Sequence, residues 1–236
     1  MGLQEVNQST PLLAEKLGMH YVQQDKRTAL LSRFPIKEVS PKRFGVKLEL
    51  DNGKEVGFFN VHATSFPFQP AQIARKPSGG GPYISTEAEA IRWADWTRGD
   101  EFRSIISEAN SFGVPAVVTG DFNEPSHLDW TSRAADAELF PFKVQWPGST
   151  AFEKAGFKDS YRELRPDEVA LPGRTWPAKE EGKPGDPNVR IDYIMHRGDG
   201  LKLISSDIIG ESKETSDIVV DPYPTDHRAI LATFQV

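Results

Sequence analysis

Short segments of alternating apolar and polar residues recur along most of the chain. This period of two is typical of half-buried strands, whose successive side chains point to opposite faces of a sheet. It predicts strands at residues 20–23, 28–33, 44–50, 55–63, 116–120, 189–197, 201–209 and 228–236. Between the strands at 44–50 and 55–63, Asp51, Asn52 and Gly53 predict a hairpin turn, because Asn and Gly tolerate a positive φ.

Two shorter segments carry helix patterns instead. Residues 9–18 place Pro11 in the first turn and Gly18 at the C-terminal end, which are the positions that favour these residues. Residues 126–139 follow a predicted strand and also read as a helix.

The longest helical pattern covers residues 85–113. It begins with a capping-box arrangement at Thr86 and Glu89 and ends at Gly113. Gly99 lies inside it, so the segment is predicted to be one long helix or two helices joined near this residue.

Two segments rich in Pro and Gly, residues 65–85 and 164–188, are predicted to be long loops. The chain has no internal repeat, no low-complexity tract and no change of composition that would mark a linker. We therefore predict a single α/β domain over residues 1–236, with mostly antiparallel strands and two long loops.

The composition is that of an ordinary globular protein, with 38% hydrophobic and 26% charged residues. The absence of cysteine excludes disulfides, thiolate chemistry and cysteine-bound zinc. No apolar run approaches the ~20 residues that span a bilayer, so no membrane-spanning segment is expected. The composition leaves the localisation open.

The net charge of −6 does not favour a protein that grips duplex nucleic acid, because such proteins usually carry a basic surplus. A local basic groove would nevertheless be hidden by this average. Clustering on one face would support a nuclease, and the candidates are Arg75, Lys76, Arg92, Arg98 and Arg103.

Acidic, amide and imidazole side chains occur at the ends of predicted strands. They are Glu5, Asn60, His62, Asp121, Asn123, Asp192, Asp226 and His227. Each alone has a structural explanation, since strand-terminal Asp and Asn often bond their own backbone and a single His is often a packing residue. Together, several oxygen donors and two histidines without cysteine favour a hard ion, Mg²⁺ or Mn²⁺, and the hydrolysis of phosphate esters.

Five sequence motifs make this interpretation specific. "GLQEV", "NVH", "GDFNEPS", "RIDYI" and "TDHRAI", in this order and across the whole chain, resemble the motifs of the endonuclease/exonuclease/phosphatase superfamily. The resemblance implies the deoxyribonuclease I-like fold, a four-layer α/β sandwich with two mostly antiparallel central sheets flanked by helices.

The resemblance also implies roles for residues around a metal ion. Glu5 would be the principal carboxylate ligand of Mg²⁺ or Mn²⁺, and Asp226 would lie on the metal side of the site. Asp121 would orient and activate the attacking water, and Asn123 would bond the phosphate or hold Asp121.

Three further residues would act on the phosphate. Asp192 would bond the imidazole of His227 and keep it protonated against the phosphoryl oxygens, as charge stabilisation requires. His62 would contact the phosphate and assist departure of the leaving group.

Substrate selectivity is expected to reside in the two long loops. Arg75 and Tyr83 in the first loop, and Arg174 and Trp176 in the second, offer cationic and aromatic groups for an anionic or aromatic part of a substrate. An equally simple explanation makes them ordinary loop residues, with Trp176 packed over the core.

The chain departs from the family pattern in two places. Family members begin with a further strand that carries an Asn near the metal, whereas this sequence starts at "MGLQE", so an N-terminally truncated domain is expected. The residues after "LQE" lack the Lys of the apurinic endonucleases, and "EPSHLDW" after "GDFN" lacks the aromatic-Arg segment of the inositol phosphatases. The motif set is closer to phosphodiesterases.

The leading hypothesis is a monomeric, Mg²⁺- or Mn²⁺-dependent phosphoesterase that acts on phosphodiesters. Its predicted partner is a small molecule or a single-stranded nucleic acid. Two alternatives stay open: a nuclease acting on DNA or RNA, and an inactive, truncated binding domain.

Overall fold

A six-stranded sheet forms the centre of the structure, a computed structural model that describes residues 1–6, 9–178 and 187–236. Its strand order is β4-β5-β6-β7-β9-β8. The bounds are β4 Ile36–Val39, β5 Gly45–Glu49, β6 Glu55–His62, β7 Ala116–Asp121, β8 Lys158–Asp159 and β9 Asp192–Arg197. Neighbouring strands are antiparallel except β6 and β7, which run parallel.

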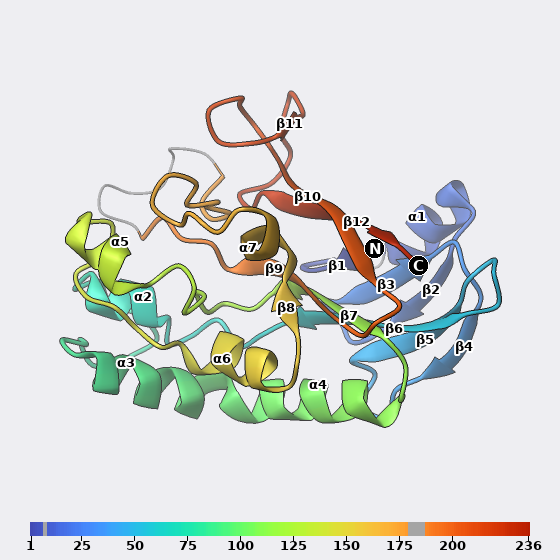
Figure 1. The fold of residues 1–236 in the computed structure, drawn as a ribbon, viewed down its shortest axis with the longest axis horizontal. Coiled ribbons are helices and arrows are strands. Elements are labelled where there is room, and N and C mark those ends of the chain that lie inside the picture. Colours follow the sequence, from blue (N-terminus) through green and yellow to red (C-terminus); the bar gives the residue numbers. More distant parts are fainter. Residues whose placement is uncertain (7–8, 179–186) are drawn as a thin grey trace.

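Two three-stranded sheets pack on one face of the central sheet (Figure 1). One has the order β1-β3-β2, with β1 Gly2–Leu3, β2 His20–Gln23 and β3 Ala29–Ser32. The other has the order β11-β10-β12, with β10 Lys202–Gly210, β11 Ile218–Val219 and β12 Ala229–Gln235. Within the described residues, the second sheet layer therefore consists of two separate pieces.

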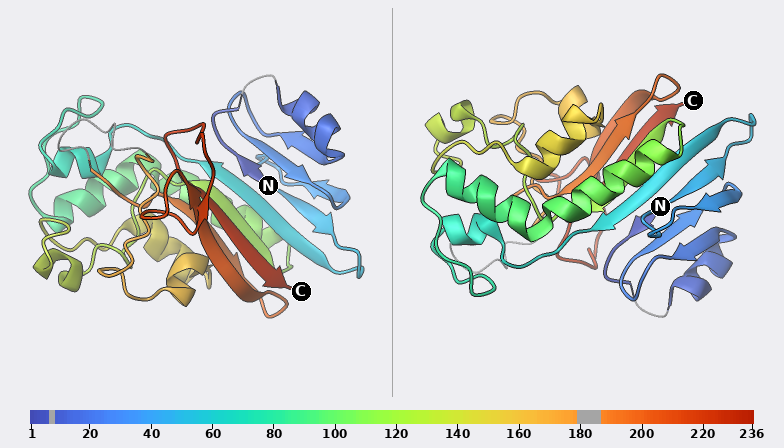
Figure 2. Two further views of the ribbon diagram at one scale, coloured as in Figure 1. Left: turned by 90° about the horizontal axis from the view of Figure 1, so that it is seen from above. Right: turned by 90° about the horizontal axis from the view of Figure 1, so that it is seen from below.

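Helices complete the outer layers (Figures 1 and 2). A long helical segment lies under the central sheet; it comprises α3 Glu87–Ala94, the π-helical turn η1 Asp95–Gly99 and α4 Asp100–Ser111, with α6 Pro147–Lys154 beside it. On the opposite side, α1 Thr10–Leu17 covers β2 and β3. The shorter helices are α2 Gln69–Ile73, α5 Ser132–Asp136 and α7 Ser160–Leu164. The predicted four-layer α/β sandwich is confirmed.

The largest apolar cluster lies between the central sheet and the helices below it. Phe59 and Val118 contribute from the sheet, and Phe102 and Ile105 contribute from α4. The ring of Phe102 packs against the ring of Phe122, at a centroid distance of 5.5 Å. This core lies directly behind the strand ends that carry the polar residues, and it gives them a rigid support.

Local sequence rules predicted most element ends. Gly18 closes α1 with a φ of 61°, and Gly53 forms the predicted hairpin turn with a φ of 76°. Thr86 caps α3 in a complete capping box with Glu89, and Gly113 follows α4 with a φ of 64°. The helix interrupted near Gly99 is also confirmed, because η1 ends at this residue.

Two predictions were wrong. Residues 126–139 are not one helix, because only α5, residues 132–136, is helical and Thr131 caps its start. The Ser126 carbonyl accepts the backbone N–H of Asp129 and of Trp130, so the preceding segment forms turns instead. Residues 65–85 are not all loop, because they contain the short helix α2.

Candidate active site

Three neighbouring strands of the central sheet bring polar residues to one edge. β6 ends at His62 and β7 ends at Asp121, whereas the antiparallel β9 begins at Asp192. His62 pairs with Asp121, and Asp121 pairs with Asp192, in the sheet register. Cross-strand partners point to the same face, so these three side chains share one surface.

Gly120 permits this close arrangement immediately before Asp121. Its φ of 130° lies in a region that favours glycine, and a Cβ atom there would lie 2.0 Å from the Val61 carbonyl oxygen. Any side chain at this position would push β6 and β7 apart beside the catalytic edge.

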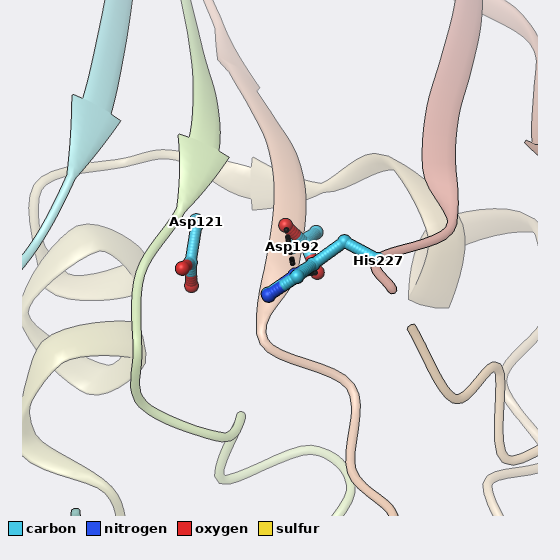
Figure 3. A group of neighbouring side chains, drawn as sticks. All are labelled: Asp121, Asp192 and His227. Carbon is cyan, nitrogen blue, oxygen red and sulfur yellow. Dashed lines mark hydrogen bonds and ion pairs between the residues drawn. The ribbon is translucent and has the colours of Figure 1, made fainter. Parts of the chain in front are cut away.

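Asp121, Asp192 and His227 form a compact cluster (Figure 3). One ligand atom from each lies within 4.8 Å of the others. His227, which precedes β12, points its Nδ1 toward Asp192, at 3.0 Å from Oδ2 and 3.3 Å from Oδ1. Thr175 holds Asp192 from behind, because its hydroxyl accepts the backbone N–H groups of Ile191 and Asp192.

The surroundings of His227 favour its charged form. Burial by itself would lower the pKa of the imidazole, but the hydrogen bond that it donates to Asp192 and the charges of Asp192, Asp121 and Asp226 raise the pKa of His227 to about 9. The side chain is therefore an imidazolium at neutral pH, paired with a carboxylate.

Asp121 is buried and rigidly held. Asn123 donates its backbone N–H to Oδ1 at 2.7 Å and its side-chain Nδ2 to Oδ2 at 2.8 Å. Asn123 adopts a left-handed conformation with a φ of 47°, which Asn tolerates better than most residues. Burial raises the pKa of Asp121, and so does the neighbouring charge of Asp192, whereas His227, Asn123 and Arg98 act in the opposite direction.

His62 and Glu5 lie next to Asp121. The Nε2 atom of His62 is 3.6 Å from Asp121 Oδ2 and 3.7 Å from Glu5 Oε1. Burial and then the charge of Arg27 lower the pKa of His62, so its neutral form is favoured. Glu5 itself is exposed and bonds Arg27 Nη2 at 2.5 Å. The structure thus brings the N-terminal acid to the catalytic edge, although outside the Asp121–Asp192–His227 cluster.

Asp226 lies on the other side of His227. It is exposed, and its Oδ2 accepts a hydrogen bond from Trp176 Nε1 at 3.3 Å. The ring of Trp176 lies 6.3 Å from the ring of His227 and packs edge-on against Phe68. Trp176 therefore borders the cluster and also packs on the apolar core through Phe68.

The donors at this edge suit a hard divalent ion. Carboxylate oxygens are the ligands that Mg²⁺ and Mn²⁺ prefer. The buried carboxylates Asp121 and Asp192 repel each other, and this repulsion raises the pKa of Asp121. A cation nearby would relieve this cost.

A sequence model of the endonuclease/exonuclease/phosphatase family matches residues 1–227. This chain belongs to that family. An uncharacterized protein from Caenorhabditis elegans is 26% identical over 210 residues, a match that covers 80% of this chain and 63% of that protein. The chain thus spans less than two thirds of the length of this curated relative.

Solved structures show the same fold. The 3′ phosphatase NExo from Neisseria, bound to a product DNA hairpin, has a TM-score of 0.58 at 16% identity and covers 100% of this chain and 87% of its own. An AP endonuclease from Archaeoglobus fulgidus has a TM-score of 0.56 at 15% identity, with 100% and 88% covered. Truncated TDP2 from Caenorhabditis elegans has a TM-score of 0.55 at 21% identity, with 100% and 83% covered.

The loop residues proposed for selectivity in this family member differ in their placement. Arg75 stacks on Tyr83 at 5.7 Å from the ring centroid and donates to Ser85 Oγ, so these two residues form a contact within their own loop. Arg174 is half-buried, and its Nε finds no hydrogen-bond partner among the described residues. Burial and then the charge of Arg228 lower the pKa of Arg174. Part of the second loop, residues 179–186, lies outside the described residues.

Two of the five basic residues whose clustering would support a nuclease are either buried or paired with acids. Arg98 is buried with 2% of its surface exposed, and Arg103 is paired with Asp95 and Asp100. The Arg92 guanidinium lies 5.8 Å from the Trp93 ring centroid. These contacts weaken the argument for a groove that grips duplex nucleic acid.

Several residues of the edge gave no sign in the sequence. Arg27 contacts Glu5, Thr175 supports Asp192, and Arg98 with Glu124 lies beneath Asp121. In the sequence, Arg98 stands only as one of five candidates for a basic groove and Glu124 only as part of the "GDFNEPS" motif, and neither has a partner nearby in sequence. Only the folded chain brings these groups together.

Proposed function

We propose that this protein is a divalent-metal-dependent phosphoesterase with a preference for phosphodiesters. The carrying observation is the cluster of Asp121, Asp192 and His227, in which a buried carboxylate lies beside an imidazole held in its charged form. Such a cluster combines a proton acceptor with a cation that stabilises phosphoryl oxygens.

Asp121 is the proposed general base. It takes a proton from the attacking water while the oxygen of that water forms a bond to phosphorus and the bond to the leaving-group oxygen breaks. The two hydrogen bonds from Asn123 fix the orientation of the carboxylate. A raised pKa makes Asp121 a stronger base than an ordinary carboxylate.

His227 is the proposed electrostatic catalyst. Its Nδ1 is engaged by Asp192, which leaves Nε2–H free to donate to a phosphoryl oxygen. His62, whose neutral form is favoured, is proposed to contact the phosphate and to donate a hydrogen bond from its N–H to the departing oxygen, keeping its proton. Roles for both histidines thus follow from opposite shifts of their pKa values.

Glu5 is the proposed principal metal ligand, and Asp226 is proposed on the same side of the site. A bound Mg²⁺ or Mn²⁺ would supply a Lewis acid for the charge that develops on the phosphoryl oxygens. Glu5 pairs with Arg27, and Asp226 accepts a hydrogen bond from Trp176. Each acid would give up this partner when it binds the metal ion. Such exposed pairs contribute little to stability, so this exchange is energetically small.

Small or single-stranded substrates are proposed over duplex DNA. Trp176 borders His227 with a half-buried ring, and Arg174 lacks a counter-ion among its described neighbours. An aromatic ring and a cation suit a substrate with an exposed base or a second anionic group. Arg75 and Tyr83 would bind substrate only through the face that their stacked pair leaves exposed.

Hydrolysis of bis-p-nitrophenyl phosphate tests the proposal. We expect turnover with Mg²⁺ or Mn²⁺ and none after addition of EDTA. Asp121→Ala should lose the turnover, whereas Asp199→Ala, a matched variant of an exposed acid, should keep it. Comparison with p-nitrophenyl phosphate and with single-stranded and duplex oligonucleotides then ranks the substrates. Near-full turnover in Asp121→Ala would refute its role as the base.

Metal binding separates this proposal from an inert binding domain. A ligand that binds only the native state raises its stability by about 2.7 kcal/mol at 100 times its Kd. Millimolar Mn²⁺ is therefore expected to raise the Tm of the wild type. The rise in Tm should be smaller in Glu5→Gln and equal to that of the wild type in Glu15→Gln, which alters an exposed acid on α1. No shift in the wild type would favour the inert domain.

A further inference from the structure

Arg98 is a charged side chain enclosed in the protein beneath the catalytic edge. Its side chain has no exposed surface, and it lies on the π-helical turn η1 that separates α3 from α4. Such turns insert an extra residue into a helix and occur frequently at functional sites. Trp96, two residues earlier on the same turn, is instead 70% exposed.

The guanidinium bonds the segment that follows His62. Its Nε donates to the Thr64 carbonyl at 3.0 Å, its Nη1 donates to Gln69 Oε1 at 2.7 Å, and its Nη2 donates to the Pro67 carbonyl at 3.3 Å. Three separate bonds from one planar group fix both the position and the rotation of this segment.

On its other side, Arg98 faces the segment that follows Asp121. The Nη1 atom lies 3.5 Å from Glu124 Oε2, and neither side chain is exposed by more than 1%. Glu124 Oε1 accepts the backbone N–H of Gly148 in the first turn of α6, and its carbonyl accepts the hydroxyl of Tyr193 on β9. Glu124 therefore anchors its segment to a helix and to the strand that carries Asp192.

A purely structural explanation accounts poorly for this choice of residues. Burying an ion pair gains little stability over apolar side chains of similar volume, because the desolvation cost offsets the attraction. What a planar, multiply bonded cation adds is a fixed geometry between the segments that it joins.

We infer that Arg98 is a positioning residue of the active site, which with Glu124 holds the segment of His62 and the segment of Asp121 at a fixed separation. The inference rests on the proposed function, because it assigns Arg98 an effect on turnover. Arg98 has no exposed surface from which to contact substrate or metal, so its loss is expected to lower kcat through misplacement of the two side chains and to leave KM and metal affinity nearly unchanged.

The test compares Arg98→Met, Arg98→Lys and Glu124→Gln with Arg103→Met, a variant of an exposed Arg on the next turn of the same helix. Misplacement by about 1 Å costs on the order of 100-fold in rate. Arg98→Met is expected to lose about that factor in kcat, with KM and the Kd for Mn²⁺ within about threefold of wild type. Arg98→Lys restores part of the loss, and Arg103→Met behaves as wild type.

A second readout is independent of catalysis. The imidazole NMR signals of His62 are expected to shift in Arg98→Met and in Glu124→Gln but not in Arg103→Met. Should Arg98→Met fail to fold, Arg98→Lys and Glu124→Gln carry the same comparison. Unmoved His62 signals, or a kcat within threefold of wild type in folded Arg98 variants, would overturn the inference. Absence of turnover in the wild type would refute the proposed function. The NMR comparison would then still test whether Arg98 and Glu124 fix the position of His62.

Discussion

The two central acids of the site, Asp121 and Asp192, lie in different electrostatic surroundings. Asp192 forms an ion pair with His227, whereas burial and then the charge of Asp192 raise the pKa of Asp121. The charged form of Asp121 therefore costs folding free energy, as expected where a reactive carboxylate is kept available for chemistry. Stability and activity should separate at this residue.

Replacing Asp121 by Asn is expected to abolish turnover and to raise stability in EDTA. A raised carboxyl pKa means that Asp121 binds more protons in the native state than in the unfolded state, so its contribution to stability falls as pH rises from about 4 to about 8. Asp121→Asn lacks this fall, and its Tm at pH 7 should exceed that of wild type by about 2–4 °C, which corresponds to about 1 kcal/mol. Thermal melts at pH 4 and pH 7 measure the difference. A variant less stable than wild type at pH 7 would contradict the origin assigned to the pKa shift.

Asp192 is expected to control the charge of His227. In Asp192→Asn the pKa of His227 should fall from about 9 toward the ordinary value of ~6.5, because the charge of Asp192 is lost and an amide oxygen is a weaker acceptor than a carboxylate. NMR titration of the imidazole measures this shift directly. The turnover at pH 8 should drop by at least about 100-fold, because the imidazole is then neutral. A pKa that stays near its wild-type value would show that other groups hold the proton.

The sequence predicted these residues better than it predicted their supports. Asp121, Asn123, Asp192 and His227 stand in recognisable motifs at strand ends, and the fold brings all four together. Thr175 and Arg98 act through bonds to residues 16 to 34 positions away along the chain. No local pattern encodes contacts of that separation, so only tertiary structure shows them.

At the scale of elements, the same distinction holds. Strand periodicity, a hairpin turn and helix caps are local properties, and the sequence placed β5, β6, α1 and α3 with small errors. The helix predicted over residues 126–139 was wrong because backbone turns around Ser126 compete with a helix start. Local propensity does not decide between a turn and a helix there. The helix α7 escaped prediction because its five residues are too few to show a clear period, and α6, although as long as α1, was not predicted either.

The support of the catalytic edge by α4 can be tested by one core deletion. Phe102 is 1% exposed and packs against Phe122 and Phe152 at centroid distances of 5.5 and 5.9 Å. Phe102→Ala should cost about 3–5 kcal/mol, through lost burial and the cavity that remains. Trp96→Ala, which removes an exposed ring from the same helical segment, should change stability by less than about 0.5 kcal/mol. Urea denaturation compares the two, and equal losses would contradict the assigned core.

At the scale of the whole molecule, the fold and family follow from five short motifs, but the substrate does not. The described residues contain no helix that is both long and apolar enough to cross a bilayer. The net charge of −6 spreads over a surface on which Arg103 and Arg133 are paired with acids. Under the proposed function, selectivity would therefore depend on a few groups near Trp176 and Arg174 rather than on a broad electrostatic field.

This charge distribution predicts how substrate binding responds to salt. Each phosphate neutralised on duplex DNA adds about −0.9 to the slope of log affinity against log salt concentration. Because Arg98 is buried and Arg103 is paired, duplex binding should show a slope no steeper than about −2, from at most two phosphate contacts. Fluorescence anisotropy between 50 and 300 mM NaCl measures this slope for the duplex and for a single strand of the same sequence. The Asp121→Asn variant is used so that the nucleic acid is not cleaved. The single strand should bind more tightly, because its unstacked bases can lie against Trp176. A slope of −6 or steeper on duplex would mean that a basic surface does assemble, and the protein would then be a duplex nuclease.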